Sequence, residues 1–287
     1  MRWFALLFLV FSAHGGPFKD MLKVIGGNDA QKVIDIAETA ERTFEKITPE
    51  QEYYIGRTVG ATIVSTYRPY RDVTANRYLN TLGQTLAMAS DRPQTFGGYH
   101  FQILDTDEVH AFAAPGGLIF VSRGMIKLAG NEDTLAAVLA HEVAHVQFEH
   151  GVKAIKKSRF AEVGNLLANE ATKTLNAAEQ AQLAKAFGGS IDDITSTLMT
   201  AGYSKTSEYQ ADEGAVTILR RAGYDPHVLE DLLAALGAQE GAAKKGFFST
   251  HPPASTRAER VSKLIETERR DVAPIRSARF QQALSFE

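Results

Sequence analysis

The feature that most constrains this chain is a His-Glu-x-x-His pattern, which starts at His141 and ends at His145 inside an apolar stretch. Asn131 precedes the stretch as a helix-capping residue type, and Gly151 stands where a helix would end. We therefore predict a helix over residues 132–150. Because it is apolar almost all round, most of its surface should be buried. Two histidines four positions apart face the same way from a helix and can bind one metal ion.

The acidic residue of the pattern, Glu142, lies where it can reach a water molecule held by such a metal. The same five residues also arise by chance, and buried histidines are often hydrogen-bonded core residues. A structural protein with a chance pattern would bind no stoichiometric metal. A hydrolytic zinc site needs three protein ligands and one open position, so a third ligand distinguishes the two interpretations.

Two carboxylates further along the chain are candidates for that third ligand. Glu208 and Asp212 lie one turn apart on a predicted helix that Ser204 can cap and Gly223 can end. One carboxylate can complete a metal site, while the other accepts a hydrogen bond from a ligand histidine. The alternative is a solvent-exposed acidic helix face, and the spacing alone leaves both open.

The composition narrows the class of protein. The chain has 287 residues, 44% of them hydrophobic, and no internal repeat, so it can bury a sizeable core in a single domain. Its net charge of −3 and its single short basic cluster, within residues 153–159, give no nucleic-acid surface. It has no cysteine, which excludes disulfides and Cys-ligated zinc. Any zinc must be held by histidine and carboxylate.

The N-terminus has the plan of a secretory signal peptide. One arginine is followed by an apolar run over residues 3–11 and by small residues up to position 16. We predict a signal peptide over residues 1–15 and one domain over residues 16–287. The alternative for this segment is an N-terminal part of the core. No later stretch has the length and composition of a membrane span.

The remaining pattern predicts a mainly helical protein with a small sheet before the metal-binding helix. Thr48 can cap a helix through a capping box with Gln51, and Asp225-Pro226 can start another. Further predicted helices cover residues 28–47, 78–88 and 255–269, together with most of residues 151–200. Strands are predicted at residues 99–104 and 117–121.

Four ordered motifs together resemble one known family. They are Ala-Phe-Ala-Ala-Pro-Gly-Gly-Leu-Ile-Phe-Val from Ala111, the His141 pattern, Gly-Tyr-Ser from Gly202 leading to Glu208, and Ser-Thr-His-Pro-Pro around His251. Residues 48–264 thus resemble the zinc metallopeptidases grouped with the CaaX prenyl protease and the periplasmic peptidase that helps to assemble outer-membrane proteins. The resemblance implies an α+β, zincin-like domain, mainly helical, with a small sheet beside the metal-binding helix.

The resemblance also implies roles for individual residues. One zinc ion would be bound by His141, His145 and Glu208. Glu142 would be the general base, and Asp212 would orient a ligand histidine, His141 in our interpretation.

A second set of implied roles concerns the substrate. His251 and Arg257 would stabilise the oxyanion, although local context fits Arg260 in place of Arg257, and His251 can instead block the open position of zinc. Where the family usually has Asn and Arg, this chain has His110 and Lys205, which puts their substrate-binding roles in doubt. Residues 116–122 would be the edge strand that pairs with an extended substrate, and the predicted substrate-binding residues are Gly116, Gly117, Leu118, Ile119, Phe120 and His110.

We therefore expect a zinc-dependent endopeptidase that hydrolyses exported or misfolded proteins with metal-activated water and a glutamate base. Its partners would be protein or peptide substrates, with no nucleic acid. We expect export to the periplasm and leave open a peripheral association with a membrane or with envelope proteins. The alternative is a chaperone-like envelope assembly factor whose zinc site is structural or closed.

Overall fold

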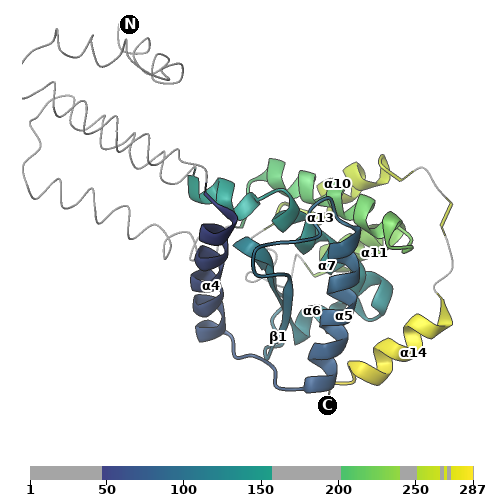
Figure 1. Ribbon diagram of the computed structural model, residues 1–287. Helices are drawn as coiled ribbons and strands as arrows, with labels where there is room; N and C mark the ends of the chain where they lie inside the picture. The colour runs from purple at the N-terminus through teal and green to yellow at the C-terminus, as the bar shows by residue number, and fades with distance from the viewer. Residues whose placement is uncertain (1–46, 157–201, 240–250, 266–267, 270–272, 287) are drawn as a thin grey trace, which may run out of the picture. The chain divides into compact units, whose positions relative to one another are not determined.

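A computed structural model of the chain describes residues 47–156, 202–239, 251–265, 268–269 and 273–286 (Figure 1). All of them fall within one compact unit. The predicted signal peptide, the predicted helix over residues 28–47 and most of the predicted helical segment 151–200 lie outside the described residues. The division into a signal peptide and a single domain stays a prediction.

The sheet has three described strands and the order β1-β3-β2, so β3 is the central strand. β1 and β3 are parallel, whereas β2 and β3 are antiparallel and joined by the short 3-10 turn η1. Gly116 takes a φ of 76° in this turn, a backbone conformation that glycine adopts readily. The bounds are β1, His100–Leu104; β2, Ala111–Ala114; η1, Pro115–Gly117; and β3, Leu118–Ser122.

This strand order contradicts one prediction. Residues 116–122 were expected to form the edge strand, but β3 pairs on both sides and residues 115–117 form the turn before it. The edge beside the metal-binding helix is instead β2, which the sequence pattern did not predict as a strand. Strand order depends on pairing between distant segments, so the short apolar run did not reveal which strand lies at the edge.

Helices cover both faces of the sheet (Figure 1). α4, which Thr48 caps through the predicted capping box, packs on one face through Val59 and Ile63. α5 and α7 pack on the other face, within the main hydrophobic core. The bounds are α4, Pro49–Thr66; α5, Val73–Ala89; α6, Arg123–Ala129; and α7, Glu132–Gln147.

The helix α7, which carries His141 and His145, is buried along its length, as predicted. The Asn131 side chain caps it by accepting a hydrogen bond from the Thr134 amide at 2.8 Å. The helix ends at Gln147, and not at residue 150 as predicted, because Glu149 takes a left-handed φ of 54°. A new helical segment starts at His150.

The C-terminal helices lie over α7 and complete the core (Figure 1). Ser204 caps α10 as predicted. α13 is shorter than the predicted helix over residues 255–269, and α14 was not predicted because its sequence is mostly polar. The bounds are α10, Lys205–Arg221; α11, His227–Gly237; α13, Ala254–Ser262; and α14, Pro274–Ala283.

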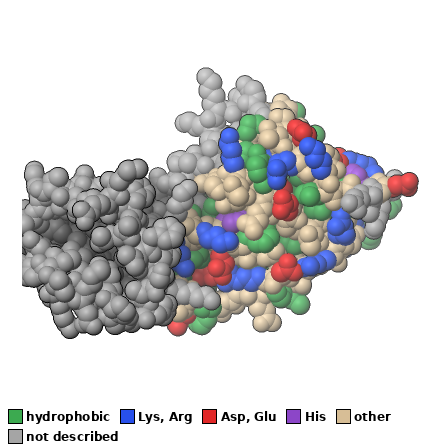
Figure 2. All heavy atoms as spheres, turned by 90° about the horizontal axis from the view of Figure 1, so that it is seen from above, with side chains coloured by type: hydrophobic (Ala, Val, Ile, Leu, Met, Phe, Trp, Pro, Cys, Tyr) green, Lys and Arg blue, Asp and Glu red, His purple; other side chains and the backbone are tan. Residues whose placement is uncertain are grey.

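On the face in Figure 2, acidic and basic side chains are intermingled, with no continuous stretch of one sign. In the part of the chain that the structure describes, no helix combines the length and the apolar character needed to cross a membrane.

Candidate active site

Four side chains with metal-binding atoms converge from three parts of the chain. His141 and His145 come from α7, Glu208 from the first turn of α10, and His251 from the residues just before α13. Their ligand atoms all lie within 4.8 Å of one another. The structure therefore brings together the three predicted ligands and adds His251 to the same cluster.

The separations within this cluster suit a tetrahedral zinc ion. The Nε2 atoms of His141 and His145 are 3.0 Å apart, and they lie 3.4 and 3.5 Å from the Glu208 oxygens. His251 Nε2 is also 3.4 Å from Glu208 Oε2. Zinc bonds of about 2.0–2.1 Å at tetrahedral angles place ligand atoms about 3.3–3.4 Å apart. The donor set of imidazole nitrogen and carboxylate oxygen is also one that zinc prefers.

The burial of Glu208 supports the same conclusion. Its side chain is 0% exposed, yet within the described residues neither of its carboxylate oxygens has a hydrogen-bond partner. A buried carboxylate without donors is costly unless a cation is near it. The chain thus places an anion where the surrounding histidine nitrogens can share a metal with it.

Behind the cluster, Asp212 and Arg257 form a buried pair that contacts His141. Arg257 donates to both Asp212 oxygens, from Nε at 2.9 Å and from a terminal nitrogen at 2.7 Å. Asp212 Oδ1 lies 3.1 Å from His141 Nδ1, the ring nitrogen that faces away from the other ligands. Burial raises the Asp212 pKa, but Arg257 outweighs it, and the pKa falls well below its usual range. Asp212 is therefore an anionic acceptor that can fix the His141 ring.

Glu142 faces a cavity beside the cluster. Its Oε1 atom is buried and, among the described residues, has no hydrogen-bond partner. Burial, together with the negative charge of Glu208, raises the Glu142 pKa to about 7. A carboxylate with that pKa and an unpaired oxygen is suited to take up and return a proton.

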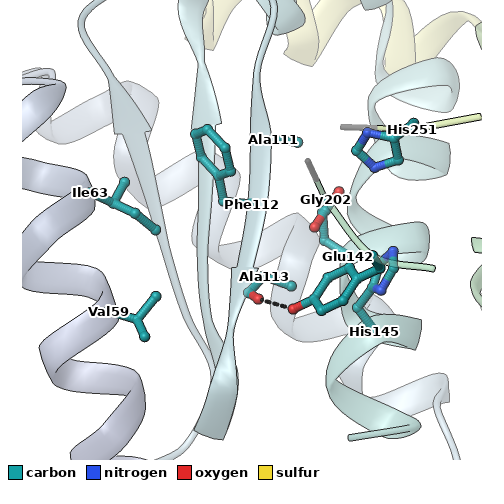
Figure 3. Close-up of a pocket in the computed structure, with 10 residues that line it drawn as sticks. Val59, Ile63, Ala111, Phe112, Ala113, Glu142, His145, Gly202 and His251 are labelled. Atoms are coloured by element: carbon teal, nitrogen blue, oxygen red, sulfur yellow. Dashed lines mark hydrogen bonds between the residues drawn. The ribbon is translucent and has the colours of Figure 1, made fainter. Parts of the chain in front are cut away.

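The cavity runs from the candidate ligands to α4 (Figure 3). Val59 and Ile63 point into it from α4, opposite Glu142, His145 and His251. β2 lies between these walls, and the Tyr203 hydroxyl donates to the Ala113 carbonyl at 2.8 Å. The lining residues are Val59, Ile63, Ala111, Phe112, Ala113, Glu142, His145, Gly202, Tyr203 and His251.

Several predicted residues lie away from this cavity lining. His110 is buried against Tyr67 and Glu108, with Nε2 2.9 Å from the Glu108 carboxylate. Arg257 lies behind the ligands on Asp212, while Arg260 is half exposed beside Glu213, so only Arg257 belongs to the site. Residues 116–120 do not line the cavity, and their predicted substrate contacts are not supported by the strand order.

Sequence reasoning missed two features of the site. Tyr203 stacks on His145 with ring centroids 4.3 Å apart, and the Gly-Tyr-Ser motif was the available signal. His150 was not among the predicted site residues, yet its ring contacts His145. Its position five residues beyond His145 gave no hint of this contact, because an unbroken helix would separate the two rings.

A buried helix with His-Glu-x-x-His, a carboxylate from a second helix and a small adjoining sheet define the class of zincin-like metallopeptidases. The model of peptidase family M48 matches residues 74–265, and the chain belongs to this family. The predicted family, fold class and metalloendopeptidase class are thereby confirmed.

Similar proteins carry related names. The chain is 29% identical over 187 residues to a beta-barrel assembly-enhancing protease of Yersinia pestis, covering 63% of this chain and 37% of that protein. It is 27% identical over 241 residues to a putative beta-barrel assembly-enhancing protease of Vibrio cholerae, covering 80% and 47%. It is 26% identical over 162 residues to metalloprotease YcaL of Escherichia coli, covering 56% and 60%. The chain spans less than half the length of the first two relatives.

Proposed function

We propose that the protein is a zinc-dependent endopeptidase that cleaves exported or misfolded proteins. The observation that carries this proposal is the buried Glu208 carboxylate, which lies among three histidine nitrogens without a hydrogen-bond donor. His141, His145 and Glu208 would hold one zinc ion. Family membership supports peptide-bond hydrolysis as the reaction.

Bound zinc would supply a Lewis acid that polarises a carbonyl group and acidifies water. Glu142 takes the proton from the attacking water through its unpaired Oε1 and returns it to the departing amine. Asp212 and Arg257 keep the His141 ring oriented from behind the site. Arg257 thus acts by positioning His141, and of the two residues predicted to stabilise the oxyanion only His251 lines the cavity.

An extended substrate would pair with β2 as an added strand. This strand is the edge of the described sheet on the side of the cavity, and its Ala113 carbonyl points to Tyr203. Backbone pairing needs no free terminus, which suits an endopeptidase. A substrate strand would have to displace the Tyr203 hydroxyl from Ala113, while Val59 and Ile63 offer apolar contacts to its side chains.

We propose that the protein is exported and acts in the periplasm. The predicted N-terminal signal peptide supports it, as do relatives whose names refer to β-barrel assembly. Association with membrane or envelope proteins belongs to the same proposal. Cell fractionation of the full chain beside a chain without residues 1–15 tests this location.

The experiment for the activity compares wild type with Glu142→Gln. We expect the variant to keep stoichiometric zinc, because its ligands remain, and to lose roughly 10²- to 10⁴-fold in casein cleavage with the base removed. Metal analysis and a peptidase assay on the same preparation measure both quantities. Wild type that binds no zinc would contradict the proposal, and a fully active variant would remove Glu142 from the mechanism.

His251 distinguishes an open enzyme from the closed-site alternative. Its Nε2 atom lies among the ligand atoms and 3.4 Å from Glu208 Oε2, which fits a fourth ligand that closes the zinc site. We therefore expect His251→Ala to raise peptidase activity and to add an exchangeable water to zinc.

X-ray absorption of the zinc protein and an activity assay test this expectation. A loss of roughly 10²- to 10³-fold with unchanged coordination would instead assign His251 as an oxyanion donor. A zinc protein that remains inactive in both forms would favour the assembly-factor alternative.

A further inference from the structure

His150 is a buried histidine beyond the His-Glu-x-x-His pattern that the proposed mechanism does not use. It is 2% exposed, and its two ring nitrogens each contact a different element. Nδ1 lies 2.9 Å from Nδ1 of His145, and Nε2 lies 3.0 Å from Oε1 of Gln210 on α10. His150 thus connects a candidate metal ligand to the helix that carries Glu208.

The break in the backbone after α7 makes this contact. On an unbroken α-helix, residues five apart point about 140° away from each other. Here α7 ends at Gln147, and Glu149 takes a left-handed φ of 54°, which residues other than glycine rarely adopt. The turn brings the His150 ring back to His145. The contact between His150 and His145 therefore depends on the unfavourable backbone conformation of Glu149.

The hydrogen-bond directions along this chain of groups are mutually consistent. His145 Nε2 points to the other ligand atoms, and a metal-binding nitrogen carries no proton. The ring proton of His145 is then on Nδ1, which donates to Nδ1 of His150. This leaves the His150 proton on Nε2, from which it is donated to the Gln210 side-chain oxygen. Each nitrogen and oxygen in the sequence has one matching partner.

Aromatic rings confine the two imidazoles in addition. Tyr203 stacks on His145 with centroids 4.3 Å apart, and Phe148 stacks on His150 with centroids 5.7 Å apart. The His145 ring is therefore held on one face by Tyr203 and at its outer nitrogen by His150.

We infer that His150 is a positioning residue that orients His145 as a metal ligand, and that Gln210 fixes the tautomer of His150. This inference rests on the proposed zinc site. α10 would then supply a ligand, Glu208, and the acceptors behind both ligand histidines, with Asp212 behind His141 and Gln210, through His150, behind His145.

The test measures zinc affinity of the full chain by competition with a chelator, without any substrate. We expect His150→Ala to weaken zinc binding about 10- to 100-fold, the usual effect of losing the partner of a ligand histidine. Gln210→Leu should weaken it less, and Gln210→Glu should stay near wild type because it keeps an oxygen acceptor. His227→Ala is the matched control, since His227 bonds to Asp225 at 2.7 Å and is not part of the metal cluster.

The cobalt-substituted proteins provide a second readout, because a displaced His145 ring changes the visible spectrum of the metal. Unchanged zinc affinity in folded His150→Ala would overturn the inference and leave His150 a packing residue. If that variant does not fold, equal affinities in Gln210→Leu and Gln210→Glu would overturn it. Failure of the proposed function has a different signature, namely wild type that binds no zinc or an active Glu142→Gln.

Discussion

Two buried carboxylates, one at the start of α7 and one packed against its middle, have opposite surroundings. Glu132 opens α7 and is 1% exposed, yet it accepts hydrogen bonds from Tyr78 at 2.7 Å, from Tyr224 at 2.9 Å and from Arg279. Glu208 packs against the middle of the same helix with no exposure, and no donor among the described residues reaches it with hydrogen-bond geometry. Its nearest nitrogens belong to the histidines of the candidate site.

The difference indicates that Glu132 stabilises the fold, whereas Glu208 is suited to bind a cation. Burying a carboxylate is costly unless hydrogen bonds or a cation compensate for the lost water. At Glu132 the chain supplies every partner from its own side chains, so this cluster holds α7 against α5, α14 and the residues between α10 and α11. At Glu208 no described residue donates a hydrogen bond, and imidazole nitrogens surround the carboxylate. An unsatisfied buried acid is thus a better indicator of function here than burial or charge alone.

The sharpest test of the comparison is Glu208→Ala. We expect zinc affinity to fall roughly 10²- to 10³-fold. The free energy of zinc binding is divided among three or four ligands, and this variant removes one of them. The metal-free variant should be less stable than metal-free wild type at neutral pH, because burial raises the Glu208 pKa but the histidines and Arg257 outweigh it and lower the pKa. Chelator competition and urea unfolding measure the two effects. Full zinc occupancy in this variant would mean that another residue is the third ligand.

Glu132→Gln should produce the reverse pattern, with a loss of stability and no change in zinc affinity of the folded protein. We expect about 2–3 kcal/mol of unfolding free energy, because several hydrogen bonds to a charged group weaken together. Arg279 adds little, since its side chain is about half exposed. Urea unfolding of the metal-free protein at neutral pH measures this loss.

The same variant predicts a change in acid sensitivity. Burial raises the Glu132 pKa, but hydrogen bonds from Arg279, Tyr78 and Tyr224 outweigh it and lower the pKa. A lowered folded pKa stabilises the protein above the unfolded value of about 4.3, and this stability is lost as pH falls through the folded value. Wild type should therefore lose more stability than Glu132→Gln on going from about pH 5 to pH 3. Parallel acid-unfolding curves would contradict the charged role of Glu132.

Asp212→Ala should weaken zinc binding less than Glu208→Ala does. We expect zinc affinity to fall about 10- to 100-fold, because His141 keeps its metal-binding nitrogen and loses only the partner of the other one. Asp212→Asn, which keeps an oxygen for His141, should lie between this variant and wild type. Since both changes leave Arg257 buried without its carboxylate, zinc affinity is compared only in variants that unfold cooperatively. Unchanged affinity in both would make Asp212 a partner of Arg257 alone.

The sequence was most informative where the structure depends on neighbouring residues. The capping residues Thr48, Asn131 and Ser204 mark helix starts correctly, because a cap bonds to amides within three positions. The grouping of His141 and His145 on one face of α7 follows from helical spacing for the same reason. The Glu208 motif required the family resemblance, since the spacing of Glu208 and Asp212 fits an exposed acidic face equally well.

Features that depend on distant contacts were not predictable. β3 is the central strand because it pairs with β1 as well as with β2, and the prediction of an edge strand did not include the pairing with β1. The end of α7 at Gln147 depends on the conformation of Glu149, for which no glycine served as a signal. The position of Arg257 behind Asp212 requires α13 to pack near α10, a contact across 45 residues. Two of these failures concern tertiary contacts, and the third concerns a backbone conformation that a glutamate does not signal.

The residues that surround Glu132 are synthesised at widely different times during translation. Arg279, one of the groups that neutralises the first turn of α7, lies 147 positions further along the chain. At a synthesis rate of about 5–20 residues per second, it is made about 7–30 s after Glu132. During that interval the nascent chain already contains the His-Glu-x-x-His residues of α7. Arg279, which pairs with Glu132 in the first turn of this helix, has not yet been synthesised. The first turn of α7 therefore gains its last hydrogen-bond partner only with the last helix to be synthesised in the described part of the chain.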